Sequence, residues 1–446
     1  MTSSPAGGPP DDPGPSTGSG AGTDRLDAAG AVADAHRREW AFVLAATARV
    51  AGDLDLAEEC VQDAYVSALE AWSQQGVPRN PGAWLTTTAR RRAIDLLRRD
   101  TTLRRKLPLL VEPAAATPPP AGQLAAEEGS GVIPDDRLRL IFTCCHPALA
   151  REAQVALTLR LVCGLSTAEI ARAFLVPEPT MAARVTRAKK KISAARIAYR
   201  VPGAAELPDR LDAVLTVVHL LYTTGHTAPD GGSLVRDDLV DRAIRLARML
   251  HQLMPDEPEV RGLLALLLLT DARRATRSAP DGRLLLLAEQ DRTQWDRQAI
   301  GEGTALVREA LRSGRPGRFA LQAAIAALHA QAPSYADTDW RQILQLYDLL
   351  GRAWTSPVVT LNRAVALAMA EGPEAGLAAI GELERDGRLA GYRYLPAAKA
   401  DLLRRLGRRD EAAQAYRAAL DLTANQAERS FLRHRLAEVT GNQPGS

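Results

Sequence analysis

One stretch of the chain, residues 83–99, combines apolar residues at helical spacing with a run of arginines, and it constrains the fold more than any other part. The apolar positions are Leu85, Ala89, Ile94 and Leu97, and Asn80-Pro81 upstream can start the turn before a helix. Between Trp84 and Lys106 there are eight Lys or Arg and two Asp, which gives this segment a local positive field. The stretch predicts a helix that holds nucleic acid, and a solvated basic face on a packing helix is the alternative.

The composition of the whole chain favours helices and a reducing compartment. Only 4% of the 446 residues are aromatic, and the formal charge is +3, so a nucleic-acid role depends on local clustering of charge. The four cysteines are unevenly spaced and no apolar run of signal-peptide type begins the chain, so we expect a cytoplasmic protein. The longest apolar run, residues 263–269, is far shorter than the roughly 20 residues of a membrane-spanning helix.

A predicted helix over residues 56–69 carries an acidic and amide face. Its apolar side consists of Leu56, Cys60, Ala64 and Leu69. This arrangement leaves four polar side chains outward, namely Glu58, Glu59, Gln62 and Asp63. They suit a basic protein partner, although an ordinary solvated face gives the same pattern.

Two segments are too poor in apolar residues to pack. Residues 1–23 predict a disordered tail, and residues 107–134, which include three consecutive prolines, predict a flexible linker. The helices that follow contain Cys144-Cys145-His146. Adjacent cysteines lack the C-x-x-C spacing that directs two thiolates to one zinc ion, so we expect small buried cysteines, no metal site and no cofactor.

Residues 164–192 have the pattern of a helix-turn-helix. Ser166 and Glu169 form a capping box for the first helix, and Pro177 to Pro179 enforce the turn. Thr180 is the expected cap of a second helix, whose inward positions are Met181, Val185, Ala188 and Ile192. Residues 180–200 hold seven Lys or Arg and no acid, which suits a DNA-recognition helix and leaves an unrelated basic helical hairpin as the alternative.

These two motifs resemble the extracytoplasmic-function (ECF) sigma factors, which direct bacterial RNA polymerase to promoters. The run Ala57-Glu58-Glu59-Cys60-Val61-Gln62-Asp63 resembles the family's helix for the β′ clamp of the core polymerase. The resemblance therefore implies polymerase binding by Glu58, Glu59, Gln62 and Asp63. Residues 80–95 resemble the segment that melts and reads the −10 element, and residues 180–189 resemble the helix that reads the −35 element.

The resemblance also implies two sets of DNA-binding residues. The −10 set is Trp84, Arg90, Arg91, Arg92, Arg98 and Arg99. The −35 set is Thr180, Met181, Arg184, Arg187, Lys189 and Lys190. A sigma factor opens DNA by capturing an unstacked base, which costs a few kcal/mol that pocket and phosphate contacts must offset. The linker then separates two readers of promoter elements that lie well apart on the duplex.

More than half of the chain follows the helix-turn-helix, and helical patterns dominate it. They run over residues 211–222, 239–250, 259–274, 300–312, 319–331 and 339–350. Near the end, small and aromatic residues fall close to the spacing of a tetratricopeptide repeat of about 34 residues. These residues are Ala400, Leu403, Gly407, Ala412, Tyr416 and Ala419. The pattern predicts a helical solenoid that binds a regulatory protein or peptide or packs on the sigma domains, and plain core packing is the alternative.

The whole ordered length resembles a subgroup of ECF sigma factors that carries such an extension and is regulated through it. Three runs of the extension are too polar to be plain core: Asp271-Ala272-Arg273-Arg274, Asp291-Arg292-Thr293-Gln294-Trp295-Asp296 and Leu361-Asn362-Arg363-Ala364. A further loop, Asp230-Gly231-Gly232-Ser233, lies just beyond the DNA-reading domain. Its glycines allow a tight turn, and its position suggests a regulatory loop through which the extension docks on or releases the sigma domains.

The predicted fold class is all-α, with two helical sigma domains joined by a flexible linker and followed by a tetratricopeptide-like solenoid. The predicted parts are a tail (1–23), a domain for core polymerase and the −10 element (24–106), the linker (107–134), a helix-turn-helix domain for the −35 element (135–200) and the extension (201–440).

Two other functional classes stay open. The chain could be a helix-turn-helix regulator with a tetratricopeptide sensor domain that does not bind polymerase. It could also be an enzyme that uses Asp230, His226, Asp291 or Asp296 as acid-base groups. No residues have metal-ligand or triad spacing, and Asp beside Arg more often forms structural ion pairs, so we expect no enzyme.

Overall fold

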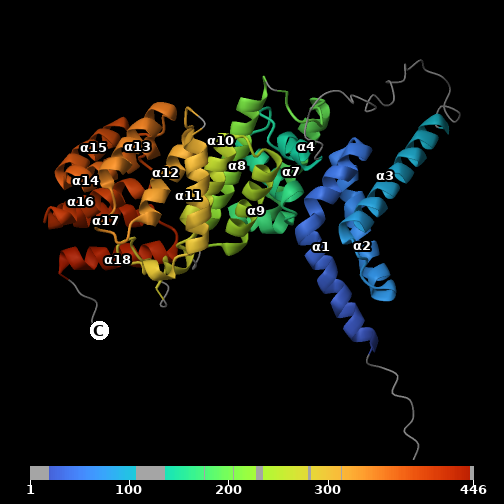
Figure 1. Ribbon diagram of the computed structural model, residues 1–446, viewed down its shortest axis with the longest axis horizontal. Helices are drawn as coiled ribbons and strands as arrows, with labels where there is room; N and C mark the ends of the chain where they lie inside the picture. Colours follow the sequence, from blue (N-terminus) through green and yellow to red (C-terminus); the bar gives the residue numbers. More distant parts are fainter. Residues whose placement is uncertain are drawn as a thin grey trace, which may run out of the picture. The chain divides into compact units, whose positions relative to one another are not determined.

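The computed structural model describes residues 20–106, 136–174, 176–203, 205–227, 235–279, 283–312 and 314–441. Over these residues the chain is all-α, with 18 α-helices and no β-strand, which confirms the predicted fold class (Figure 1). Three predicted features fall outside the described residues: most of the tail, the linker, and the loop formed by Asp230, Gly231, Gly232 and Ser233.

The chain divides into two compact units, which we describe separately. Unit 1 contains residues 1–143, 156–172 and 176–200, and unit 2 contains residues 144–155, 173–175 and 201–446. The division therefore does not follow the order of the chain. A piece of the helix-turn-helix region, residues 144–155, belongs to the same compact unit as the C-terminal extension.

Unit 1 begins with three helices that each pack on the other two: α1 (Gly20–Ala51), α2 (Leu54–Gln75) and α3 (Pro81–Lys106). Gly52, with a φ of 66°, makes the turn from α1 to α2. The side chain of Asp53 then accepts hydrogen bonds from the backbone N–H groups of Asp55 and Leu56 at 2.8 and 2.9 Å, which caps α2. The bundle presents α2 and α3 in a fixed mutual orientation.

Two apolar residues that the sequence places in this core are exposed instead. Ile94 is 37% exposed and Leu69 is 44% exposed. The buried stripe of α3 runs through Leu85, Ala89 and Ala93, one residue before Ile94, and a helix turns by about 100° per residue. In α2 the neighbour Ala68 occupies the core in the same way. In both helices the buried stripe therefore passes through an alanine, and the larger residue that follows it is exposed.

The rest of the helix-turn-helix region consists of α4 (Asp136–Cys144), α5 (Arg151–Leu157), a π-helical turn (Thr158–Val162), α6 (Thr167–Phe174) and α7 (Glu178–Ala194). Within unit 1, the indole Nε1 of Trp40 donates a 3.0 Å hydrogen bond to the carbonyl of Leu161. Gly164 follows with a φ of 69°, and a Cβ there would lie 3.0 Å from the Trp40 ring. The Trp40 side chain of α1 therefore fixes the turn that leads into α6.

Helix α10 (Pro258–Asp271) lies against most of its neighbours in the first half of unit 2. It packs on α8 (Leu207–His226), α9 (Asp237–Leu253), α11 (Arg297–Arg312) and α12 (Arg318–Gln331). Gly262 lets α12 approach, because a Cβ there would lie 2.5 Å from the backbone nitrogen of Ala320. The apolar run at 263–269 is buried in this packing, and no described helix is long and apolar enough to cross a membrane.

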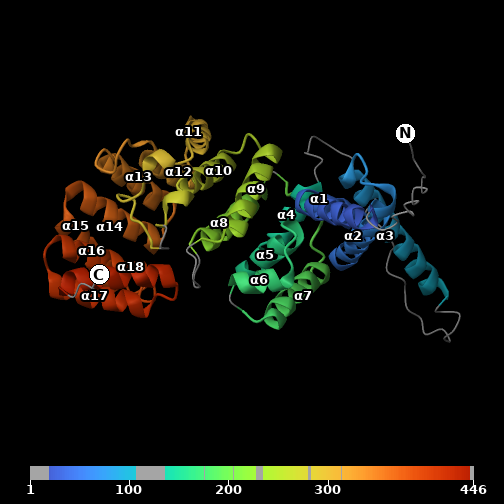
Figure 2. The ribbon, with the colours of Figure 1, turned by 90° about the horizontal axis from the view of Figure 1, so that it is seen from below.

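The remaining helices pack in chain order, each on its neighbours (Figure 2). They are α13 (Trp340–Ala353), α14 (Pro357–Glu371), α15 (Pro373–Asp386), α16 (Tyr394–Arg405), α17 (Arg409–Asp421) and α18 (Gln426–Thr440). The residues of the predicted repeat form one core between α16 and α17, where Ala400, Ala412 and Ala419 are fully buried. Gly407 turns the chain between these two helices with a φ of 73°.

Candidate nucleic-acid and polymerase interface

The start of α3 places one aromatic side chain of the predicted −10 set. Asn80 caps the helix, since its side-chain oxygen accepts a 3.0 Å hydrogen bond from the N–H of Ala83. One turn on, Trp84 is half-buried and meets Trp72 edge to face, with ring centroids 5.7 Å apart. Part of the Trp84 ring therefore stays accessible beside the basic face of the helix.

The arginines of α3 lie mostly on the outside of the bundle. Arg91, Arg92, Arg98 and Arg99 are exposed and Arg90 is half-buried. Arg92 differs from Arg91 because its Nε lies 2.5 Å from Oδ2 of Asp63 on α2. The structure thus joins a residue of the predicted −10 set to a residue of the predicted polymerase-binding set.

The predicted polymerase-binding face of α2 is only partly outward. Glu59 and Gln62 are exposed and Asp63 is half-buried. Glu58 contradicts the outward prediction, because only 6% of its side chain is exposed. It is buried by charge pairing, with Oε2 2.7 Å from Nζ of Lys189 on α7 and Oε1 in contact with the guanidinium of Arg160.

Lys189 completes a cluster of charges inside unit 1. Its Nζ also lies 2.6 Å from Oδ1 of Asp55, and the Lys189 side chain is only 10% exposed. Burial alone would lower the pKa of Lys189, but the charges and hydrogen bonds of Glu58 and Asp55 outweigh it and the pKa is raised. Asp55 and Arg160 were not predicted as site residues. Asp55 pairs with Lys189, 134 residues away, and Arg160 pairs with Glu58, so no local pattern could indicate these contacts.

The helix-turn-helix forms largely as predicted. The Ser166 N–H donates to Glu169 Oε2 at 2.7 Å and the Glu169 N–H donates to Ser166 Oγ at 3.2 Å, which confirms the capping box. The predicted cap at Thr180 is wrong, because α7 begins at Glu178 and Thr180 lies in its first turn. Pro177, with extended backbone angles, already starts the helix, and Pro179 fits there because a first-turn N–H needs no helical acceptor.

The residues of the predicted −35 set do not all lie on the exposed face of α7. Met181, Val185, Ala188 and Ile192 form the buried face, as predicted. Met181 is 0% exposed, so its membership of the DNA-binding set is wrong: it packs in the core. Thr180, Arg187 and Lys190 are exposed and Arg184 is half-buried, whereas Lys189 faces the carboxylates of α2. The accessible −35 candidates are therefore four of the six.

Three family models match the chain, and their order is that of the two motifs and the extension. The model described as Sigma-70 region 2 matches residues 35–102, and Sigma-70 region 4 matches residues 139–192. Residues 210–311 match a family of unknown function, DUF6596. An uncharacterized protein of Rhizobium meliloti is 44% identical over 384 residues, which cover 86% of this chain and 90% of that protein. No solved structure matches the chain.

The chain belongs to the ECF sigma factors with a C-terminal extension. It therefore binds core RNA polymerase and promoter DNA and takes part in promoter recognition and transcription initiation. The two matched regions favour this function over a helix-turn-helix regulator that acts without polymerase.

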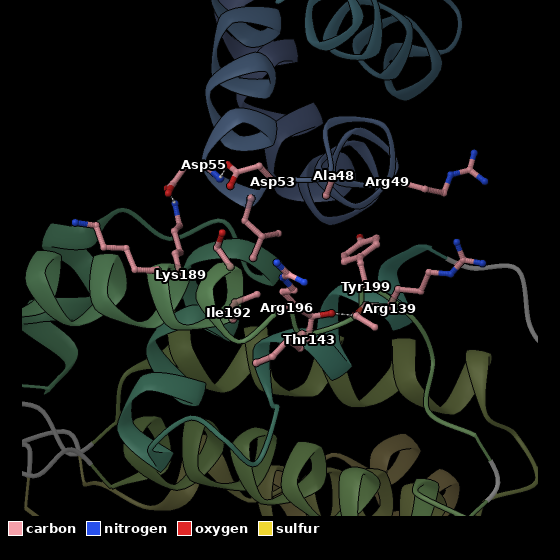
Figure 3. Close-up of a pocket in the computed structure, with 16 residues that line it drawn as sticks. Ala48, Arg49, Asp53, Asp55, Arg139, Thr143, Lys189, Ile192, Arg196 and Tyr199 are labelled. Atoms are coloured by element: carbon pink, nitrogen blue, oxygen red, sulfur yellow. Dashed lines mark hydrogen bonds and ion pairs between the residues drawn. The ribbon is translucent and has the colours of Figure 1, made fainter. Parts of the chain in front are cut away.

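A cavity of about 740 Å³ lies between the region 2 and region 4 parts of unit 1 of the sigma factor (Figure 3). Lys189 and Asp55 point toward each other at its edge. The hydroxyl of Tyr199, another lining residue, donates a 3.0 Å hydrogen bond to the carbonyl of Ala45. Around this cavity the two parts of unit 1 are joined by polar contacts between distant residues, such as those of Lys189 and Tyr199.

The other residues that the sequence raised as chemical groups have structural roles in the sigma factor. Cys144 and Cys145 are buried, and no cluster of potential metal ligands occurs among the described residues. Asp291 caps a short 3-10 helix, Arg292–Gln294, and Asp296 accepts a 2.9 Å hydrogen bond from the N–H of Ala299 at the start of α11. His226 stacks on Tyr222 with ring centroids 5.1 Å apart.

Proposed function

We propose that this sigma factor switches between a closed form, in which regions 2 and 4 hold each other, and an open form that binds polymerase and both promoter elements. One observation carries the proposal: Glu58 of the polymerase-binding set and Lys189 of the −35 set form an ion pair at 2.7 Å. Neither side chain can meet its own target while it is paired with the other. Binding of the polymerase clamp to α2 would compete for Glu58 and so favour the open form.

The residue-level roles follow from exposure and charge. In the open form, Glu58, Glu59, Gln62 and Asp63 would face a basic helix of the clamp. Trp84 would stack on an extruded base, and the arginines of α3 would hold the adjacent phosphates. On α7, Arg184 and Arg187 would meet the −35 element, with Thr180, Lys189 and Lys190 on its phosphates.

Core-polymerase binding in the absence of DNA tests the closed form. Replacing Lys189 with Met removes one of the two cations that hold Glu58, the other being Arg160, so the open form gains population and the affinity for core polymerase rises. The matched control is Lys190→Met, which changes an exposed neighbour and leaves this affinity unaltered. Glu58→Gln weakens core binding if Glu58 contacts the clamp. Equal core affinity of Lys189→Met and the parent would reject the closed form.

We further propose that the extension, with a tetratricopeptide-like arrangement in its second half, controls promoter activity in cis through region 4. The support is that residues 144–155 lie inside the region 4 match and share unit 2 with the extension. In this unit the charges of Arg210 and Glu206 act on His146. A change in the extension therefore has a direct physical route to region 4.

Transcription from the cognate promoter by the full chain and by a chain ending at Arg200, at matched protein levels, tests this role. We expect the shortened chain to retain core binding through region 2 and to transcribe at a clearly different level. If both chains transcribe alike, the extension is not a control element.

A further inference from the structure

Unit 2 contains a cavity of about 520 Å³ that the sigma function does not explain. It is lined by residues of α8, α10, α12, α13 and α14 and by the segment that precedes α11. Leucine, isoleucine, valine and alanine side chains form most of its wall, together with Trp295, Tyr347 and Trp354. A cavity of this size and lining is typical of a pocket for one small molecule.

The three polar runs that stand out in the sequence of the extension meet at this cavity. Arg273 comes from the first run, Trp295 from the second and Asn362 from the third. The runs are separated by about 20 and about 65 residues, so packing of the helices, not chain proximity, brings them together. One residue of each run therefore lines the same cavity.

Arg273 is the exceptional group in the wall. Among the described residues its side chain has no hydrogen-bond acceptor and no ion-pair partner, and burial lowers its pKa. The neighbouring arginines all have acceptors: Asp237, Asp241 and Asp271 for Arg274, the His226 carbonyl and Thr227 hydroxyl for Arg277, and the His329 and Ala332 carbonyls for Arg292. Arg273 is half-buried in the wall of the cavity, so its guanidinium is a cation facing a mostly apolar space, which suits an anionic ligand.

The other titratable groups of the wall keep the total charge of the site low. Burial, followed by the charge of Arg318, lowers the pKa of His219 to about 4, and burial with the charges of Arg273 and Arg292 lowers that of His329 to about 4. Both rings are therefore neutral near pH 7. The Nδ1 of His329 is buried without a hydrogen-bond partner. Among its lining residues the cavity has one full positive charge, Arg273, beside neutral polar side chains, which suits a monoanion.

The aromatic walls are held firmly in place. The indole Nε1 of Trp295 donates a 2.9 Å hydrogen bond to Thr276 Oγ1, and the Arg292 guanidinium lies 4.5 Å from the centre of the Trp295 ring. For the second ring, the Arg318 guanidinium lies 5.1 Å from the ring centre of Trp354. Cation-π contacts of this kind orient both rings, so the apolar part of the site is formed before a ligand enters.

We propose that this cavity binds a small organic carboxylate with an apolar or aromatic body, with the Arg273 guanidinium as the partner of the carboxylate. The fork of an arginine matches the two oxygens of a carboxylate, and the tryptophan-lined wall takes the apolar body. Binding of such a ligand does not depend on the regulatory role proposed for the extension and is measured without polymerase or DNA.

Calorimetric titration of the full chain with benzoate and hexanoate, each compared with its neutral amide, is the direct test. We expect each carboxylate to bind at least about tenfold more tightly than its amide, because a charge-assisted hydrogen bond contributes more than a neutral one. Inorganic phosphate, which carries more charge and no apolar body, should bind more weakly than either carboxylate. Equal affinity for acid and amide, or tighter binding of phosphate, would overturn the proposal.

Variants at Arg273 separate a ligand-binding role from a structural one. Arg273→Met should abolish the preference for acid over amide while the midpoint of thermal unfolding stays the same or rises, since the change removes a half-buried cation that has no partner among the described residues. Arg273→Lys keeps the charge without the fork and should retain part of the preference. Arg312→Met, on the exposed end of α11, is the matched control and should bind like the parent. Benzoate affinity unchanged in Arg273→Met would refute the role of Arg273.

Discussion

Lys189 in unit 1 is a nearly buried cation and Arg273 in unit 2 a half-buried one, and among the described residues only Lys189 has carboxylate partners. Lys189 lies 2.6 Å from Asp55 and 2.7 Å from Glu58, whereas Arg273 has no acceptor among the described residues. A paired buried charge joins the elements that supply it, and removal of one partner leaves the other uncompensated. A cation such as Arg273, which has no partner among the described residues and faces a cavity, is instead available to a ligand. The two cations therefore indicate an internal contact and a binding site.

Charge reversal at Lys189 should have the largest effect on this comparison. Lys189→Glu places a third carboxylate beside Asp55 and Glu58, and breaking a buried pair costs about 3–5 kcal/mol. We expect the free energy of unfolding of unit 1 to fall by about that amount in urea, measured by circular dichroism. Lys190→Glu, at an exposed position, should change it by less than about 0.5 kcal/mol. Similar losses in the two variants would contradict the paired character of Lys189.

Lowering the pH tests unit 2, because its histidines His219 and His329 are uncharged near pH 7. The pKa of His329 is lowered from 6.5 to about 4, so the folded state binds this proton less readily than the unfolded state. The stabilisation is complete above pH 6.5 and is lost as the pH falls toward 4, by about 3 kcal/mol for one histidine. We therefore expect the free energy of unfolding in urea to fall less between pH 7 and pH 4 in His329→Gln than in the parent. An equal pH dependence in the parent and the variant would count against a neutral His329.

Within α7, Arg187 contrasts with Lys189 because it is exposed. A bidentate contact to a base is worth about 1–3 kcal/mol, so Arg187→Ala should weaken binding of the holoenzyme to the promoter by about that much. It should also relax discrimination among −35 substitutions. Binding to a set of duplexes with single −35 changes measures both effects. A variant that discriminates among them as the parent does has lost no base contact.

The smallest effect is expected on α3, where a free and a paired arginine are adjacent. Arg91→Ala should weaken promoter binding on every sequence and reduce the slope of log affinity against log salt by about one. Arg92→Ala should reduce it less, because Arg92 already pairs with Asp63. Filter binding across a salt series compares them. Equal slopes for the two variants would show that the Arg92 pair opens on DNA.

Local patterns in the sequence were sufficient for the fold class and for the helix-turn-helix. The Ser166–Glu169 capping box and the inward face of α7 formed as predicted, because both depend on residues three or four positions apart. The exposed positions of Ile94 and Leu69 were missed for a related reason. Periodicity gives the direction of a stripe, but the choice between adjacent residues depends on how closely α1 packs against α2 and α3.

The candidate site was less predictable, because its contacts join distant residues. Glu58 looked like one of four outward polar residues, and only the packing of α2 against the region 4 part of unit 1 gives it Lys189 and Arg160 as partners. The position of Met181 at the start of the recognition helix suggested DNA binding, whereas its spacing from Val185 and Ala188 suggested the core. The structure buries Met181 in the core. The polar runs of the extension stood out individually, but nothing local indicated that Arg273, Trp295 and Asn362 line one cavity.

Residues 144–155 belong to the same compact unit as the extension, and this also affects the order in which the parts of a new chain can fold. Chains emerge from the ribosome from the N-terminus, and domains generally fold as units during synthesis. Region 2 can fold as soon as it has emerged, but the segment that completes region 4 must wait for helices that begin beyond Val201. A chain released before these helices are made therefore lacks the contacts that residues 144–155 have in the complete protein.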